Sequence, residues 1–414
     1  MSDNKNTLTI KNEITWTYHD TQWVLSLFGT AVGAGILFLP INLGIGGMVP
    51  LIIMTALAYP MIYLAHRGFT RFVLSSNQKN IDFTYVVVEH FGSTPGQIIS
   101  LLYFLSIFPI LLIYGVGLTN TVDSFMINQV NMTSLPRPWL SGFLIAGLAA
   151  IMMAGEKFIL RAFSTIVYPL VAILMFLSVY LIPSWQMRVI TLPSLSSLTN
   201  LWLAIPVVIF SFSHVAALSS FADVQRRHYG QNAIRKSERI LRRTSIMLIV
   251  FVMFFVFSCV LTLSPDQLTQ AKAQNVSVLS YLANATNNPF IAILGPVVAF
   301  IAITSSFIGH FLGAKESLIG MLTKCTCLSQ HHAHIFSVLV LFIIIWIVSI
   351  LNPNILEIIE ALSGPVISII LFIMPILAVY KVNALQVYRG KVSNIFVLLT
   401  GIIAMSAMVF KLLQ

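Results

Sequence analysis

Charged residues are scarce in this chain. Only 9% of its 414 residues are Asp, Glu, Lys or Arg, whereas 57% are hydrophobic and the mean hydropathy is +0.91. A soluble domain carries about 25% charged residues, so this chain has too few polar groups to cover a water-soluble globule. The composition predicts an all-α integral membrane protein, because apolar helices of about 20 residues match the hydrocarbon thickness of a bilayer.

Cysteine and catalytic motifs are scarce as well. Three cysteines, Cys259, Cys325 and Cys327, are too few for a disulfide framework. The polar N-terminus and the lack of a small-residue cleavage site after the first apolar run argue against a cleaved signal peptide. The sequence contains no nucleophile–base pair, phosphate-binding glycine loop or nucleotide motif. We therefore predict that the protein is not an enzyme and binds no cofactor.

Long apolar runs are abundant, and we expect eleven transmembrane helices. The runs lie near 22–41, 47–66, 97–122, 139–155, 162–182, 201–222, 245–263, 289–313, 336–351, 358–380 and 394–411. With the N-terminus in the cytoplasm, 19 of the 23 Lys and Arg residues fall on the cytoplasmic side. The positive-inside rule therefore predicts a cytoplasmic N-terminus and a periplasmic C-terminus. The basic run after the sixth span is then a topology signal facing lipid, and we expect no nucleic-acid partner.

An odd number of spans allows a five-plus-five inverted repeat followed by one extra helix. The predicted parts are a cytoplasmic segment (1–21), a first repeat (22–182), a second repeat (201–380) and helix 11 (394–411). The sixth span then mirrors the first. The first contains "GTAVGAG" and the sixth contains "IFSFSHV" after Pro206, so both are interrupted at mid-depth. Discontinuous helices at matching places in two halves indicate a transporter binding site.

The breaks suggest the chemistry of the ligand. A broken helix exposes N–H groups on one half and carbonyls on the other, which suit a carboxylate and an ammonium group. The centres of the first, third, sixth and eighth spans contain no Asp, Glu, Lys or Arg. A zwitterion needs no fixed counter-charge there, so we expect a small neutral amino acid. The alternative for Gly29 and Gly33 is a G-x-x-x-G face for close helix packing.

The sequence also resembles a known family, the bacterial hydroxy and aromatic amino acid permeases, and within it the serine/threonine branch. The similar stretches include "DTQWVLSLFGTAVGAGILFLPINLGIGGMVP", "IYGVGLTNT", "VIFSFSHVAALSSF", "AKAQNVSVLSYLAN", "SSFIGHFLGAKESL" and "NPNILEIIEALSGPVIS". They cover nearly the whole chain in family order. The resemblance implies proton-coupled symport of serine or threonine across the bacterial inner membrane, with the inverted-repeat fold of the amino acid–polyamine–organocation superfamily. The exact substrate stays open.

By position, the resemblance also implies a set of substrate-binding residues. In the first span, backbone groups meet the substrate carboxylate at Gly33, Ala34, Gly35 and Ile36. In the sixth span, the amino group and side chain are bound by Phe210, Ser211, Phe212, Ser213 and His214. Tyr114 of the third span is a candidate wall or hydrogen-bond donor. For each of these residues the alternative is ordinary core packing.

The coupling ion is predicted from polar residues at membrane depth, which are costly there and mark function. The candidates are His214, His310 and Glu360 for a proton, and Thr304, Ser305 and Ser306 as hydroxyl ligands for sodium. Histidine titrates near neutral pH, which suits a proton carrier. The sodium alternative stays open, as does a membrane sensor that binds an amino acid without transporting it.

A short loop holds further possible metal ligands. "KCTCLSQHHAH" contains Cys325, Cys327, His331, His332 and His334. Thiols and imidazoles are ligands that zinc and copper prefer. The C-x-C spacing is not that of a usual zinc ribbon, so we predict no metal site and leave the loop as an open question.

Overall fold

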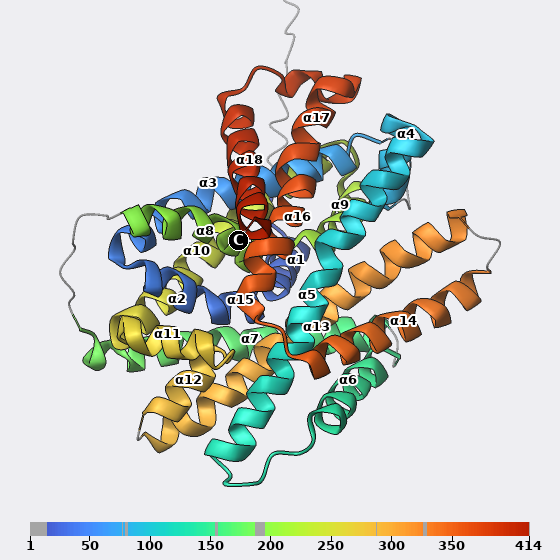
Figure 1. The fold of residues 1–414 in the computed structure, drawn as a ribbon. Coiled ribbons are helices and arrows are strands. Elements are labelled where there is room, and N and C mark those ends of the chain that lie inside the picture. Colours follow the sequence, from blue (N-terminus) through green and yellow to red (C-terminus); the bar gives the residue numbers. More distant parts are fainter. Residues whose placement is uncertain are drawn as a thin grey trace, which may run out of the picture.

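The computed structural model describes residues 15–76, 78, 82–153, 156–186, 195–286, 288–325 and 329–413. All regular secondary structure in these ranges is helical (Figure 1). The expected all-α class is therefore correct, and the described part of the predicted N-terminal segment 1–21 begins at residue 15.

Eighteen α-helices have been assigned within the described ranges. The first are α1 (Tyr18–Ala31), α2 (Ala34–Gly46), α3 (Met48–Val73), α4 (Phe83–Phe91), α5 (Ser93–Asn128), α6 (Arg137–Met153) and α7 (Glu156–Tyr180). The next are α8 (Leu195–Phe212), α9 (Val215–Tyr229), α10 (Ala233–Thr262), α11 (Pro265–Ala273), α12 (Val278–Ala285) and α13 (Pro289–Cys325). The last are α14 (Gln330–Leu351), α15 (Ile355–Ile358), α16 (Gly364–Ser368), α17 (Met374–Lys381) and α18 (Val392–Leu412).

Every predicted apolar run overlaps a helix or a group of consecutive helices. Among the described residues, seven helical stretches are long and apolar enough to cross a membrane, and the bent pair α1 and α2 makes an eighth. Three shorter apolar helices, Arg137–Ile151, Tyr168–Ser184 and Leu198–Phe212, fall on the fourth, fifth and sixth predicted runs. The structure thus has several membrane-spanning helices, and the total of eleven stays a prediction.

The tenth predicted run is one helical stretch, Ile355–Lys381, that changes its winding twice. Two π-helical segments, Ile359–Ser363 and Ile369–Ile373, interrupt its α-helical pieces α15, α16 and α17. Each π segment is followed by a proline, Pro365 or Pro375. Proline has no N–H to donate and its ring crowds the preceding turn, which explains the wider winding at these two places.

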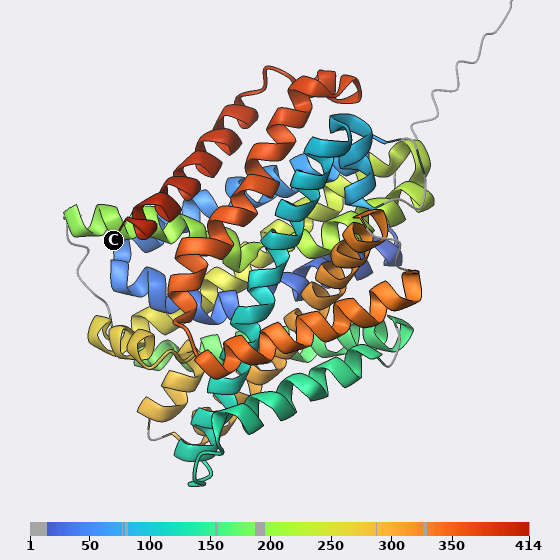
Figure 2. The same ribbon diagram turned by 45° about the vertical axis from the view of Figure 1, so that its right-hand side comes forward.

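The longest helices cross near the middle of the bundle. The long helix α5 runs diagonally through the molecule and packs along α13, while α2 and α3 both pack against α8 (Figure 1). Helix α14 lies beside α6 on one flank, and α17 and α18 form a hairpin that projects from one end (Figure 2). Helices α1, α2 and α9 each pack against α10 and α13, and α2, α8 and α9 pack against α3.

The start of α1 is fixed by a buried ionic network. Thr17 and Asp20 form a capping box, in which the Asp20 N–H donates to Thr17 Oγ1 and the Thr17 N–H donates to Asp20 Oδ2. Asp20 also accepts from Lys236 Nζ at 2.5 Å and from the Tyr229 hydroxyl at 2.6 Å. Because both charged side chains are at most 2% exposed, this network ties α1 to α9 and α10 where water cannot screen it.

Candidate functional site

The first predicted break lies between α1 and α2, whose axes differ by 57°. Val32 and Gly33 lie outside both helices. Gly33 has φ −150° and ψ −152°, an extended conformation with negative φ that does not require glycine. Glycine is needed here because the neighbouring side chains leave no room for a Cβ, which would lie 2.5 Å from Ser306 Cβ and 2.8 Å from the Tyr114 hydroxyl. Glycine therefore lets α5 and α13 approach the broken backbone closely.

A chain of hydrogen bonds reaches this break from the two neighbouring helices. Ser306 Oγ donates to the Thr30 carbonyl at 2.8 Å. A carbonyl can only accept a hydrogen bond, so the Ser306 hydroxyl uses its proton in this bond. The Tyr114 hydroxyl, 2.8 Å away, therefore donates to Ser306 Oγ. Thr30 belongs to the last turn of α1, whose carbonyls have no intrahelical donor. The protein thus satisfies one of the carbonyls that the break exposes.

The second predicted break separates α8 from α9 at Ser213 and His214. It touches the first break directly: Ser211 Oγ donates to the Gly35 carbonyl at 2.9 Å. A Cβ on Gly35 would lie 2.7 Å from the Ser211 Cα and 2.8 Å from the Phe210 ring. The sequence predicted the two breaks, and the structure shows that the interrupted helices contact each other beside them, where small residues make the contact possible.

A histidine that the sequence analysis did not select, His66 of α3, holds the second break. The rings of His66 and His214 stack with centroids 3.8 Å apart, and the His214 N–H points at His66 Nε2 at 3.3 Å. His66 is the last residue of the predicted run 47–66, next to Arg67, and was not among the candidate site residues. The structure continues α3 to Val73, and His66 lies on its buried face with Ile62 and Phe69. That spacing was the available signal.

The two breaks expose different numbers of free backbone donors. No side chain caps α2, and the bond in its first turn is a 3.2 Å contact from the Ile36 N–H to the Gly33 carbonyl. At the start of α9, the His214 N–H is bound by His66 and the Val215 N–H lies 3.4 Å from Ser213 Oγ. The start of α2 is therefore the better place for an anionic group, since helix N-termini attract negative charge.

Formal charge is kept away from the breaks. Among the described residues, the buried side chains with a formal charge are Asp20, Arg226, Lys236 and Glu360. Asp20 pairs with Lys236, while Arg226 binds the carbonyls of Val73 and Gln78 and lies 3.6 Å from Asp223. Polar groups near the breaks are hydroxyls, imidazoles and backbone. This environment suits a ligand that carries both charges itself.

The remaining candidates differ in how close they lie to the breaks. Ala34, Ile36 and Phe212 are buried beside the breaks. On α13, Ser305 bonds within its own helix to the Ala302 carbonyl, and the buried Thr304 Oγ1 has no hydrogen-bond partner. His310 lies one turn from Ser306, and its ring meets Tyr114 edge-on at 5.4 Å.

Glu360 lies apart from this group. Asn42, near the far end of α2, donates to Glu360 Oε1 at 3.0 Å, and Lys411 Nζ lies 3.0 Å from Oε2. The carboxylate therefore has a cationic partner from α18 and bonds to α2 well beyond the break. This environment fits a contact that closes one end of the bundle better than a proton site beside the substrate.

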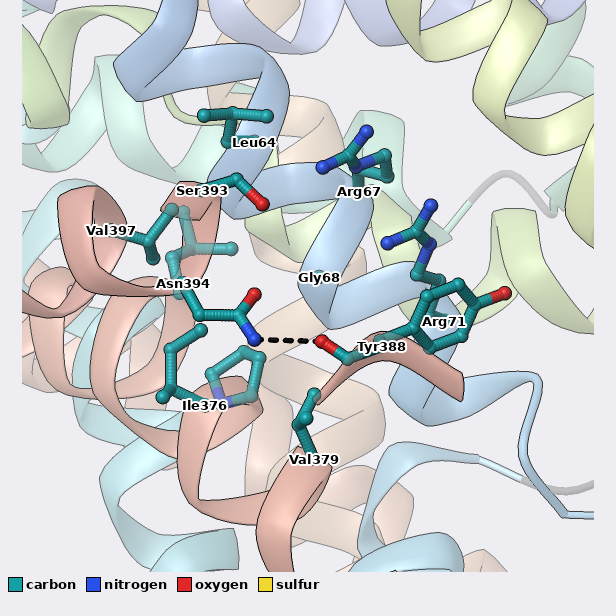
Figure 3. A pocket seen from close by; sticks show the side chains of 12 residues that line it. Leu64, Arg67, Gly68, Arg71, Ile376, Val379, Tyr388, Ser393, Asn394 and Val397 are labelled. Atoms are coloured by element: carbon teal, nitrogen blue, oxygen red, sulfur yellow. Dashed lines mark hydrogen bonds between the residues drawn. The ribbon is translucent and has the colours of Figure 1, made fainter. Parts of the chain in front are cut away.

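Two further features lie outside the site. In the loop with thiols and imidazoles, Cys327 is not among the described residues, and no group of three or more potential metal ligands gathers in the part of the chain that is described. A groove between α3, α17 and α18 has an apolar wall and a polar rim in which the Arg71 guanidinium stacks 3.8 Å from the Tyr388 ring (Figure 3). Its α3 residues, Leu64, Arg67, Gly68 and Arg71, occupy the helix face opposite His66.

Comparison with known proteins identifies the family. The sequence matches the tryptophan/tyrosine permease family over residues 22–408. It is 50% identical to the serine transporter SdaC of Escherichia coli strain K12 over 410 residues, which cover 96% of each protein. The protein of the same name from Shigella flexneri is 49% identical over 96% of each.

A solved structure shares the fold at low sequence identity. The crystal structure of MhsT in complex with L-phenylalanine superposes with a TM-score of 0.61 at 16% identity, covering 95% of this chain and 97% of that one. The curated relatives are transporters, which agrees with the prediction that the protein is not an enzyme. The chain, a multi-pass membrane protein, belongs to the tryptophan/tyrosine permease family.

Proposed function

We propose that the protein is a secondary active transporter that imports a small neutral amino acid, with serine as the first candidate and threonine as the second. The observation that carries the proposal is the pair of touching helix breaks, joined by the bond from Ser211 to the Gly35 carbonyl. The high identity to a protein named as a serine transporter supports the choice of substrate.

The proposed topology has eleven spans in the bacterial inner membrane, with the N-terminus in the cytoplasm and the C-terminus in the periplasm. Residues 22–182 and 201–380 form the two inverted repeats, and 394–411 is the added helix. The matching breaks of α1–α2 and α8–α9 support this division, since each lies in the first span of its repeat. Transport then follows from one helical bundle rocking about the site between the breaks.

The substrate carboxylate binds at the start of α2, where Gly33, Ala34, Gly35 and Ile36 present backbone groups with no side-chain cap. The ammonium group meets carbonyls at the end of α8, and the side chain is enclosed by residues of the sixth span and by Tyr114. The uncharged surroundings support a neutral substrate, because a charged side chain would need a counter-charge that the breaks lack.

The proposed coupling ion is a proton. Ser306 Oγ donates to the Thr30 carbonyl, so these two oxygens are bonded to each other. As sodium ligands, both oxygens would have to turn toward the ion, and the Ser306 proton would need another acceptor. The buried imidazoles of His66, His214 and His310, by contrast, each have one ring nitrogen whose lone pair can take up a proton.

Uptake into proteoliposomes tests the proposal. Vesicles with an imposed inward proton gradient and no sodium are expected to accumulate labelled serine, and an uncoupler is expected to abolish the accumulation. Accumulation that requires a sodium gradient would contradict proton coupling. Competition by lysine or glutamate as strong as that by neutral amino acids would contradict the substrate class.

An aromatic amino acid is the alternative substrate, because the family also carries the names of tryptophan and tyrosine and the Phe210 ring lies at the break. The same vesicles, tested with labelled tryptophan and tyrosine, distinguish the two. A sensor would bind an amino acid and show no concentrative uptake, so binding without accumulation in sealed vesicles would favour that alternative.

A further inference from the structure

Three histidines are buried at the centre of the protein, and their hydrogen bonds define which nitrogen carries the proton. His66, His214 and His310 are at most 2% exposed. Each Nδ1 lies near a backbone carbonyl: His66 at 2.7 Å from Ile62, His214 at 3.2 Å from Phe212, and His310 at 2.9 Å from Ser306. Since carbonyls only accept, each neutral ring is protonated on Nδ1 and keeps a lone pair on Nε2.

The three lone pairs are used differently. Nε2 of His214 and of His310 has no hydrogen-bond partner. Nε2 of His66 accepts the backbone N–H of His214, the residue that begins α9 at the second break. His66 is thus the one of the three whose Nε2 lone pair accepts a hydrogen bond from the backbone of a broken helix.

Among the described residues, the charged and titratable groups of the surrounding elements leave the His66–His214 pair without a fixed counter-ion. His310 on α13 and the Tyr114 phenol beside it on α5 are neutral neighbours. On α9, Asp223 lies beside Arg226 and Arg227, and Asp20 on α1 pairs with Lys236 on α10. On α3 itself, Arg67 and Arg71 face the opposite groove. Because the stacked rings are 3.8 Å apart, two positive charges in the pair would repel strongly.

We propose that His66 binds the coupling proton and thereby links proton binding to the second helix break. A proton from the outer aqueous side binds the Nε2 lone pair of His66, and the hydrogen bond from the His214 N–H to that atom breaks. The proton leaves to the inner side as Nε2 accepts the N–H again. No electrons move, and the proton and the backbone N–H compete for one lone pair. This inference rests on the proposed proton-coupled transport.

The site of competition explains how a proton could alter substrate binding. His214 follows Ser213, and Ser211 binds the Gly35 carbonyl only three residues before His214. Release of the His214 N–H therefore loosens the backbone that contacts the proposed carboxylate site. In the opposite direction, a substrate that draws this backbone away from α3 frees the lone pair and raises proton affinity, as reciprocal linkage requires.

The test separates proton coupling from folding with the variant His66→Gln. A glutamine carbonyl oxygen can accept the His214 N–H but does not titrate near neutral pH. We expect serine counterflow, which needs no net driving force, to stay within about twofold of wild type. Under an inward gradient of about one pH unit, which is a tenfold ratio of proton activity, wild type is expected to accumulate serine up to about tenfold. The His66→Gln variant is expected to show no accumulation. His90→Gln on α4, whose imidazole bonds to Ser75, is the matched control and keeps both activities.

Each possible outcome of this test either supports or contradicts the inference about His66. Proton-driven accumulation by His66→Gln equal to wild type overturns the inference and leaves the proposed function standing. Wild-type accumulation driven by sodium alone overturns both. If His66→Gln and His66→Asn lose counterflow together with accumulation, the histidine has a structural role and the inference is wrong. The inference is supported if counterflow is retained while accumulation is lost, together with the acidification of the vesicle interior that accompanies serine entry.

Discussion

The two helix breaks both place interrupted backbone inside the protein, and the neighbouring residues accommodate it in different ways. At the first, between α1 and α2, glycine removes side-chain volume so that Tyr114 and Ser306 can approach the backbone. At the second, between α8 and α9, the chain has no glycine and His66 supports the backbone by accepting a hydrogen bond. At the first break, the exposed Thr30 carbonyl accepts a hydrogen bond, and no side chain caps the start of α2. At the second break, the first N–H groups of α9 have hydrogen-bond acceptors.

This difference assigns separate tasks to the breaks. A break whose N–H groups are free can bind an anionic group, and its glycines prevent any side chain from blocking the approach. A break whose N–H is bound to a titratable ring can respond to a proton. The contact of Ser211 with Gly35 joins the two. The following substitutions test the role of space at the first break and the hydrogen bonds that the interrupted helices make.

The largest effect is expected from Gly33→Leu. A Cβ alone would lie 2.5 Å from Ser306, and a leucine side chain would also fill the space in front of the α2 start. Serine uptake is expected to fall by more than about a hundredfold, since small displacements of binding groups have effects of that size. Uptake assays in cells, with the membrane level measured by immunoblotting, check the prediction.

Gly147→Leu on α6 is the matched control, because an added Cβ there meets no atom within 4 Å. It is expected to preserve uptake. Normal uptake by Gly33→Leu would remove the substrate site from the first break, and equal losses in both variants would indicate a general effect of leucine on insertion.

A second test compares alanine at the two glycines that touch different partners. Gly35→Ala meets the Ser211 Cα, which is backbone, whereas Gly33→Ala meets the side chains of Ser306 and Tyr114. Backbone atoms shift less readily than side-chain atoms to make room for a new Cβ. We therefore expect Gly35→Ala to destabilise the protein by about 1–3 kcal/mol and Gly33→Ala by less. Thermal unfolding in detergent measures the order. The reverse order would show that Ser306 and Tyr114 are the more rigid neighbours.

A third test concerns the carbonyl exposed at the end of α1. Ser306→Ala leaves the buried Thr30 carbonyl without its donor, at an expected cost of about 1–3 kcal/mol. Tyr114→Phe removes one bond and leaves the contact of Ser306 with Thr30 intact, so about 1 kcal/mol is expected. Unfolding midpoints of both variants check the ranking. Equal losses would mean that the bond to Thr30 contributes little.

Much of this arrangement could be predicted from the sequence, because it depends on local patterns. Apolar runs located the spans, and the glycines at 33 and 35 and the polar cluster at 211–214 located both breaks. The partners of the breaks depend on tertiary contacts. Tyr114 and Ser306 were selected through resemblance and residue type, but their bond to each other and to Thr30 was not foreseen. His66 was missed because α3 continues past the predicted end of its apolar run.

The smallest effect is expected where the breaks touch. Ser211→Ala removes the bond to the Gly35 carbonyl, which lies inside α2 and can keep its ordinary helix partner. The expected loss of stability is about 0.5–1.5 kcal/mol, similar to that of Ser100→Ala, whose hydroxyl bonds to a carbonyl within α5. The two variants should differ in transport instead: Ser211→Ala is expected to weaken serine affinity several-fold, and Ser100→Ala to leave it unchanged. Concentration-dependent uptake measures both, and equal affinities would show that the breaks bind serine without needing this bond between them.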